Sequence, residues 1–204
     1  MSQISSVTAA TRTALPAPCI SCVFWQHDRI ITDERHKAAW AETFVRRHGP
    51  FGRVLHDGAT FRGMVQFGPA EAFPRALALP AGPPSRDAAL ITCTFLEGDD
   101  VEGSCERLLL EALADLKSRE IAAVEAFALT YAEDVPSADR FLGHHTLFDR
   151  GFLEGLGFIA VRSRGDVSLM RIELGGLVRG PGLVAQAVRL VKGAAEPHLR
   201  GAPV

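Results

Sequence analysis

The sequence lacks the features that would place the protein at a membrane or on a nucleic acid. Its first residues contain no uninterrupted apolar core, and no apolar run is long enough to span a bilayer. Acidic and basic residues are nearly balanced, at a net charge of −2, and are mixed along the chain. A nucleic-acid partner would require a basic patch. We therefore expect a cytoplasmic protein without a membrane or nucleic-acid partner.

Cysteine and tyrosine are also scarce. There are four cysteines, of which Cys19 and Cys22 form a single CxxC pair, and one tyrosine, Tyr131. One CxxC pair lacks the two further ligands that a structural zinc site needs, so we expect no metal. A cytosolic chain keeps its thiols reduced, and these thiols are expected to pack near the start of a helix or strand.

The residues that are present indicate one domain. The chain has 204 residues, of which 47% are hydrophobic, enough for a substantial core. The Ser-, Thr-, Ala- and Pro-rich residues 1–17 are expected to be flexible. The domain is predicted to cover residues 18–175, followed by a C-terminal helix and tail over 176–204.

Hydrophobic periodicity and turn residues predict a mixed α/β order. A helix is expected at 33–47 and a β-hairpin at 52–56 and 60–67, turned by Asp57-Gly58. The later elements are a proline-rich loop at 68–85, a buried strand at 88–95, a helix at 104–118, a strand at 121–129, a loop at 131–145, a helix at 147–156, strands at 158–164 and 167–174, and a helix at 183–191. This order predicts a mostly antiparallel sheet flanked by helices, with one crossover.

The stretch GDDVEGSC, residues 98–105, joins a buried strand to a helix. Such a turn directs backbone N–H groups and the positive end of the helix dipole at one point, which suits an anion. Gly103 would allow close approach of a phosphate, but Asp99, Asp100 and Glu102 crowd the same place. The backbone could still bind phosphate if these acids point outward. The alternative is an ordinary helix start with Gly103 or Ser104 as the N-cap.

Short motifs in a fixed order run through most of the chain, over about residues 18–174. They are Cys19-Ile20-Ser21-Cys22-Val23-Phe24-Trp25, Trp40, Asp57-Gly58, Pro69, Phe73-Pro74, Asp87-Ala88-Ala89-Leu90, Glu125-Ala126-Phe127, Phe152-Leu153 and Leu156-Gly157-Phe158. In these residues the chain resembles the GCN5-related N-acetyltransferase (GNAT) family, and most closely an actinobacterial branch that begins with a CxxCVFW segment. The resemblance implies a single GNAT-like domain.

The resemblance also implies acetyl-CoA as co-substrate and transfer of its acetyl group to a primary amine. The family's Gln/Arg-x-x-Gly-x-Gly/Ala turn falls on residues 100–105, where only Gly103 matches well and Asp100 replaces the basic or amide residue. Arg107, one turn into the helix, could compensate at the phosphate. The cofactor-binding residues implied are Thr94, Phe95, Leu96, Val101, Gly103, Ser104, Cys105 and Arg107.

Direct attack of an amine on a thioester needs a base and an acid. Glu125, a lone acid on an apolar strand, is the best candidate for the base, and its alternative is a structural pair with an arginine. Tyr131 is the candidate acid. His144 and His145 could contact substrate or cofactor.

Two other functions stay open. A non-catalytic GNAT-like protein would keep the fold and serve in binding or regulation, and another acyl-CoA or pantetheine carrier could replace acetyl-CoA. The acceptor could be a small-molecule or a protein amine. The apolar side of the helix expected at 183–191 could pack on its own domain or form a homodimer, so both monomer and homodimer remain open.

Overall fold

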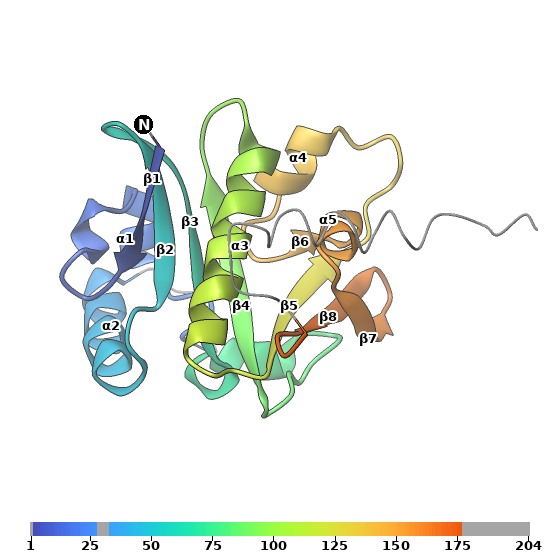
Figure 1. The fold of residues 1–204 in the computed structure, drawn as a ribbon, viewed down its shortest axis with the longest axis horizontal. Helices are drawn as coiled ribbons and strands as arrows, with labels where there is room; N and C mark the ends of the chain where they lie inside the picture. Colours follow the sequence, from blue (N-terminus) through green and yellow to red (C-terminus); the bar gives the residue numbers. More distant parts are fainter. Residues whose placement is uncertain (1, 28–32, 177–204) are drawn as a thin grey trace, which may run out of the picture.

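A computed structural model of the protein describes residues 2–27 and 33–176 (Figure 1). The strands in this part of the chain are β1 (Ser2–Val7), β2 (Gly52–Asp57), β3 (Thr60–Pro69), β4 (Ala88–Leu96), β5 (Ala123–Leu129), β6 (Phe148–Asp149), β7 (Ile159–Arg164) and β8 (Val167–Glu173). They form one sheet in the order β1-β2-β3-β4-β5-β8-β7, with β6 beside β5. The β4–β5 and β5–β6 pairs are parallel and the other pairs are antiparallel. The single-domain, mixed α/β fold is therefore as predicted.

Helices cover both faces of this sheet. Two buried clusters of apolar side chains, one on each face, hold the helices to the strands. One face carries α3 (Val101–Ser118), α4 (Ser137–Leu142) and α5 (Arg150–Gly155), and the other carries α1 (Ala17–Ser21), α2 (Glu34–His48) and the 3-10 helices η1 (Arg12–Ala14), η2 (Ala70–Ala72) and η3 (Pro74–Ala78) (Figure 1). Within the described residues, no helix combines the length and apolarity needed to cross a bilayer.

Local sequence explains the bounds of α2. The Asp33 side chain accepts hydrogen bonds from the backbone N–H groups of Arg35 and His36, which would otherwise lack partners at a helix N-terminus. Gly49, at a φ of 78°, ends the helix in a conformation that glycine adopts without strain. The buried side of α2 contains Lys37 as well as apolar Phe44, and this places a charged group against the sheet.

The N-terminal residues correct one expectation. Residues 1–17 were expected to be flexible, but residues 2–7 form the edge strand β1, which pairs with β2 from Ser2 opposite Asp57 to Val7 opposite Gly52. An edge strand needs only its backbone to pair with its neighbour, and side chains on its exposed face can be polar. A composition rich in serine therefore did not reveal the strand.

The segment before β7 is also more ordered than expected. The predicted loop at 131–145 contains α4, and the predicted helix at 147–156 is divided into β6 and the shorter α5. Only Phe141 of α4 is buried, so the six-residue helix has almost no apolar periodicity to detect. The helix expected at 183–191 lies outside the described residues.

Candidate functional site

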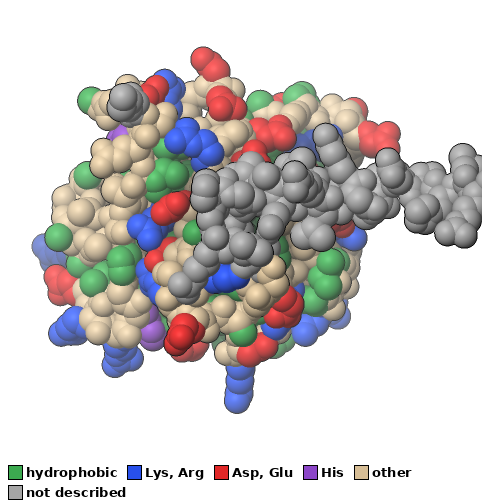
Figure 2. Space-filling view, in the orientation of Figure 1, with side chains coloured by type: hydrophobic (Ala, Val, Ile, Leu, Met, Phe, Trp, Pro, Cys, Tyr) green, Lys and Arg blue, Asp and Glu red, His purple; other side chains and the backbone are tan. Residues whose placement is uncertain are grey.

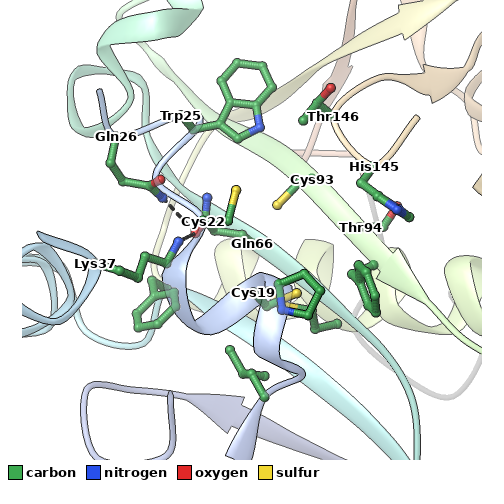
Figure 3. A pocket seen from close by; sticks show the side chains of 15 residues that line it. Cys19, Cys22, Trp25, Gln26, Lys37, Gln66, Cys93, Thr94, His145 and Thr146 are labelled. Atoms are coloured by element: carbon green, nitrogen blue, oxygen red, sulfur yellow. Dashed lines mark hydrogen bonds between the residues drawn. The ribbon is translucent and has the colours of Figure 1, made fainter. Parts of the chain in front are cut away.

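A cavity of about 260 Å³ lies on the α1–α2 face of the sheet, against β3 and β4 (Figure 3). Its wall combines apolar side chains with a few polar ones. It is lined by Leu15, Pro18, Cys19, Cys22, Trp25, Gln26, Lys37, Phe51, Met64, Gln66, Cys93, Thr94, Phe95, His145 and Thr146. Pockets of this kind, mostly apolar with few polar groups, are the usual form of small-molecule sites.

Lys37 is the only charged side chain of Lys, Arg, Asp or Glu type in that described lining. It is 5% exposed, and its Nζ donates a hydrogen bond to Gln66 Oε1 at 2.7 Å. Gln26 Nε2 donates to the same oxygen at 2.9 Å, and Gln66 Nε2 donates to Thr92 Oγ1 at 2.8 Å. The Lys37 ammonium also lies 4.9 Å from the centre of the Trp40 ring. These contacts fix the position of the charge but supply no anion to it.

Burial therefore dominates the electrostatics of Lys37. It lowers the pKa of the ammonium below the usual value of 10.5, because a charged group loses its hydration inside a protein. A buried ammonium is normally paired with a carboxylate. None of the described residues that line the cavity is an aspartate or a glutamate.

The cavity wall contains a neutral hydrogen-bond donor without an acceptor among the described residues, the Trp25 Nε1–H. Trp25 is 2% exposed, and its Nε1–H has no hydrogen-bond partner among the described residues. Buried polar groups without a partner are rare and commonly mark a place where a ligand or water binds.

Burial keeps two of the thiols in the wall protonated, those of Cys19 and Cys93. Burial raises the pKa of Cys19 to about 12 and that of Cys93 to about 11. Because the thiolate is the nucleophile and the metal ligand, protonated thiols are poor at both roles. Cys22, the other cysteine of the CxxC pair, also lines the cavity. In the described part of the chain, no three His, Cys, Asp or Glu side chains are arranged to hold a metal ion.

His145 lies on the side of the cavity opposite Lys37 (Figure 3). Its ring centre is 4.8 Å from that of Phe95 on β4. Partial desolvation lowers the pKa of His145 below its usual value of 6.5, so the imidazole is neutral at pH 7. A neutral imidazole beside a cavity can accept a proton from a bound molecule.

The glycine turn lies at the end of β4, and the structure shows where its acids point. Asp100 is the N-cap of α3, and its Oδ1 accepts a hydrogen bond from Gly103 N at 3.1 Å. The helix thus begins at Val101, three residues before the start predicted from periodicity, and neither Gly103 nor Ser104 is the cap. A Cβ atom on residue 103 would lie 2.6 Å from Asp100 Oδ2. Gly103 therefore makes room for the carboxylate of the chain itself.

On β4, which leads into this turn, the Thr94 N–H is also hydrogen-bonded within the chain. The parallel pairing of β4 with β5 covers only Ala88 to Ile91 of β4, so the two strands separate beyond that point. In this opening, Thr94 N donates to the carbonyl oxygen of His145 at 3.0 Å. The backbone of β4 expected to hold a pantetheine arm is thus paired with the chain itself at Thr94.

The remaining residues predicted to bind the cofactor fall into two groups. Leu96, Val101 and Cys105 are buried in the apolar cluster under α3, and burial raises the pKa of the Cys105 thiol. Ser104 and Arg107 line a surface groove at the start of α3. The charged side chains in the described lining of that groove are Asp57, Arg62, Glu97, Asp99, Asp100 and Arg107. Four acids against two arginines make the groove unfavourable for a diphosphate.

The face drawn in Figure 2 agrees with the balanced composition. Acidic and basic side chains are interspersed over its described surface, and neither sign forms a large continuous area.

Glu125 has a different position from the one predicted for a catalytic base. It is fully buried, and its carboxylate accepts hydrogen bonds from Ser85 N at 2.7 Å and Ser85 Oγ at 2.6 Å. Arg171 Nη1 lies 3.3 Å from Glu125 Oε1, and Arg171 Nη2 also pairs with Asp87. Glu125 does not line the cavity. The geometry favours the alternative of a structural pair with an arginine, which ties the proline-rich loop to β5.

Tyr131 is not brought together with Glu125 or with the cavity. Its hydroxyl donates to the carbonyl oxygen of Arg140 at 3.2 Å, and it lines a separate shallow pocket beside α5. Desolvation raises the pKa of Tyr131. Its place near α5 gives it no described contact with the residues around Lys37.

Sequence reasoning named Thr94 and Phe95, and considered His145, but it missed Lys37 and Gln66. A signal for Lys37 does exist, because positions 37, 41 and 44 recur at helical spacing on the buried side of α2. Gln66 follows Met64 by two residues on β3 and therefore faces the same side of the sheet. The hydrogen bond between residues 29 positions apart could not be read from either pattern.

The described residues fit acetyl-CoA only in part. The opening between β4 and β5 suits a narrow chain such as a pantetheine arm, once His145 O releases Thr94 N. The turn does not fit the diphosphate in this conformation, because the Asp100 carboxylate takes the Gly103 N–H and lies where a phosphate would bind. Two like charges 4 Å apart repel by about 1 kcal/mol in water and by more at lower dielectric.

Comparisons with known proteins show solved structures that have a similar fold. The sequence matches no family model and no curated protein. Among solved structures, it is similar to the ribosomal-protein-S18-alanine N-acetyltransferase of Escherichia coli, with a TM-score of 0.51 and 16% identity over 89% of this chain and 97% of that one. It is also similar to a Salmonella typhimurium protein solved with its cofactor acetyl-CoA and described as a proposed acetyltransferase, with a TM-score of 0.52 and 14% identity over 87% of this chain and 96% of that one.

A third similar structure carries the family name. It is a proposed acetyltransferase of the GNAT family from Desulfovibrio desulfuricans, with a TM-score of 0.51 and 14% identity over 86% of this chain and the whole of that one. The CxxCVFW branch suggested by the sequence is not tested by these likenesses. The described chain therefore has the fold of the GNAT acetyltransferases.

Proposed function

We propose that the protein is a GNAT-type acyltransferase that moves an acetyl group from acetyl-CoA to an amine bound in the cavity. The observation that carries this proposal is the cavity itself, which meets β4 at Thr94 and Phe95, next to the opening between β4 and β5. An amine in the cavity would thus lie close to a thioester held along β4. The fold shared with acetyltransferases supports the same conclusion.

The part that the chain plays is orientation of the amine and removal of its proton. The apolar wall around Trp25 and Phe51 excludes water from the bound amine. His145, neutral at pH 7, accepts the proton that the attacking nitrogen loses, and it would return this proton to the CoA thiolate that leaves as the amide bond forms. Bound acetyl-CoA would supply the activated carbonyl group. Glu125 and Tyr131 are given no part in this chemistry, because their contacts lie elsewhere.

The donor is expected to bind weakly. Binding of a diphosphate at the α3 turn would require the Asp100 side chain to rotate away from Gly103 N. It would also bring the diphosphate near Asp99 and Glu97. A donor without a diphosphate at this place, or a different acyl-CoA, would meet less repulsion.

The test is acetyl transfer to a panel of amines, followed by mass spectrometry of the product so that the four thiols do not interfere. We expect His145→Gln to lower kcat/KM by a factor of about 10²–10⁴ and to remove the acidic limb of the pH profile below pH 6.5. His144→Gln, at the neighbouring position that does not line the cavity, is the matched control. Product formation that is equal in both variants would exclude His145 as the base.

A second function has a specific observation in its favour. Because the Gly103 N–H and the Thr94 N–H are both bonded within the chain, the fold could serve as a ligand-binding protein that uses no CoA. Calorimetric titration with acetyl-CoA, CoA and desulfo-CoA separates the two functions. Absence of binding at millimolar ligand would favour the binding protein, whereas micromolar binding with acetyl transfer would exclude it.

A further inference from the structure

We propose that the cavity binds a small amino-carboxylic acid, with its carboxylate on Lys37, its amine near His145 and an apolar body between them. This deepens the proposed function, on which the role of the ligand as acetyl acceptor rests. The binding of the carboxylate itself depends only on the cavity.

The charge of Lys37 has no counter-ion among the described residues that line the cavity. Lys37 is buried, and its described polar contact is one neutral amide oxygen, Gln66 Oε1. An ammonium has three donors and a full charge, and burial without an anion is costly. The nearby thiols of Cys19 and Cys93 do not supply the anion at neutral pH, since burial raises their pKa values to about 12 and 11. A ligand carboxylate would complete the pair.

A network of side-chain hydrogen bonds holds Lys37 in place. Gln66 Oε1 accepts from both Lys37 and Gln26, while its Nε2 is held by Thr92 Oγ1. The ammonium is therefore positioned before a ligand arrives. A group that is held in its bound geometry loses little entropy on binding, and this favours affinity.

Trp25 gives evidence for the same ligand that is independent of Lys37. The Trp25 Nε1–H is a buried donor in the wall without an acceptor among the described residues. An ammonium without an anion and an N–H without an acceptor together select a ligand that is anionic and rich in acceptor atoms. A cation or a purely apolar molecule would leave both unsatisfied.

The rest of the wall limits the ligand further. The cavity volume of about 260 Å³ and the side chains of Leu15, Phe51, Met64 and Phe95 suit a compact apolar body. His145 lies across the cavity from Lys37 (Figure 3). A molecule with a carboxylate at one end and an amine at the other can reach both, which points to a short amino acid whose amine and carboxylate are separated by a compact apolar body.

The experiment is a calorimetric titration of the full chain with four matched probes. 4-(Aminomethyl)benzoate and 3-phenylpropanoate carry the carboxylate, whereas 4-(aminomethyl)benzamide and 3-phenylpropanamide lack it. We expect each carboxylate to bind at least tenfold more tightly than its amide, a difference of about 1.4 kcal/mol. Equal affinity of acids and amides, or no binding of either acid at millimolar concentration, would overturn the proposal.

Variants then assign the effect to Lys37. Lys37→Met keeps the apolar stem, and it should abolish the preference for acids and leave 3-phenylpropanamide bound as tightly as before or more tightly. Lys117→Met, on α3 and outside the cavity, is the matched control. Trp25→Phe should weaken the acids by a smaller factor, about threefold to tenfold. It gives a second test if Lys37→Met fails to fold, and unchanged acid affinity in Trp25→Phe would then contradict the proposal.

The outcome also separates this inference from the proposed function. Acetyl transfer to neutral amines without any preference for carboxylates would overturn the inference and leave the acyltransferase proposal intact. Selective binding of acids without acetyl transfer would support the inference and contradict the transferase.

Discussion

The turn at the start of α3 and the cavity on the opposite face differ in how their hydrogen-bond donors are used. At the turn, the Gly103 N–H already bonds to Asp100, and on the neighbouring part of β4 the Thr94 N–H already bonds to the His145 carbonyl. In the cavity, Lys37 lacks an anion and the Trp25 N–H lacks an acceptor among the described residues.

This difference indicates where a ligand gains most. A ligand at the turn must displace bonds that the chain already makes, so it gains only the surplus over them. A ligand in the cavity can supply the anion that Lys37 lacks and the acceptor that the Trp25 N–H lacks, so it gains more. The turn at the start of α3 is thus the weaker of the two sites by its own geometry, although it is the one that the family resemblance points to.

The largest expected effect concerns the buried carboxylate of Glu125, whose partners are Ser85 and Arg171. Arg171→Met should lower the free energy of unfolding by about 3 kcal/mol, because it leaves the buried Glu125 carboxylate without its cation. Urea denaturation measures this, with Arg164→Met on the exposed strand β7 as the control.

A second substitution sharpens that test. Adding Glu125→Gln to Arg171→Met should recover part of the loss, since an amide oxygen still accepts from Ser85 and carries no charge. If Arg171→Met left stability unchanged, the structural role of Glu125 would be wrong and its candidacy as a base would return.

Lys37→Met is expected to change the free energy of unfolding in the opposite direction. At pH 7 we expect it to raise the free energy of unfolding by about 1–2 kcal/mol, because it removes a buried charge that has no described anion. Binding sites commonly retain such a cost for function. Lys117→Met is the control, and equal stability of Lys37→Met and the wild type would mean that the charge is compensated.

The same variant has a defined pH dependence. Between the lowered pKa of Lys37 in the folded chain and 10.5 in the unfolded chain, the unfolded state binds more protons. Wild-type stability attributable to Lys37 therefore rises with pH across that window. The neighbouring groups whose charges act on Lys37 are present in both proteins, and they are Arg12, Cys19, Cys22 and Cys93. The advantage of Lys37→Met should consequently shrink as pH approaches 10.5.

Local signals were sufficient for much of the fold. Asp57-Gly58 fixes the β2–β3 hairpin, and the apolar repeat of α3 identifies that helix although not its first turn. The site was harder, because its parts come from α1, α2, β3, β4 and the segment before β6. The acids of the turn were visible in the sequence, but the direction of Asp100 depends on a side-chain rotamer that only the local backbone fixes.

Substitution of Asp100 is the most direct way to give the turn a hydrogen-bond donor that is free for a ligand. Asp100→Ala frees the Gly103 N–H and removes the charge, so acetyl-CoA should bind about tenfold more tightly, while loss of the cap lowers stability by about 1 kcal/mol. Calorimetry and urea denaturation measure the two effects. Asp99→Ala, which removes a neighbouring charge but no cap, is the control, and unchanged affinity in Asp100→Ala would mean that the turn binds no diphosphate.

The smallest expected effect is a coupling between Gly103 and Asp100. In the wild type, Gly103→Ala gains helix propensity of about 0.5–1 kcal/mol but places a Cβ atom 2.6 Å from the Asp100 carboxylate, which must leave its N–H. The loss of the cap offsets the gain, so the net change should be near zero. In the Asp100→Ala background only the gain remains. A double-mutant cycle should therefore give a coupling of about 1 kcal/mol. An additive result would show that Gly103 is not needed for the cap, and that its place in the turn is better explained by the approach of a phosphate.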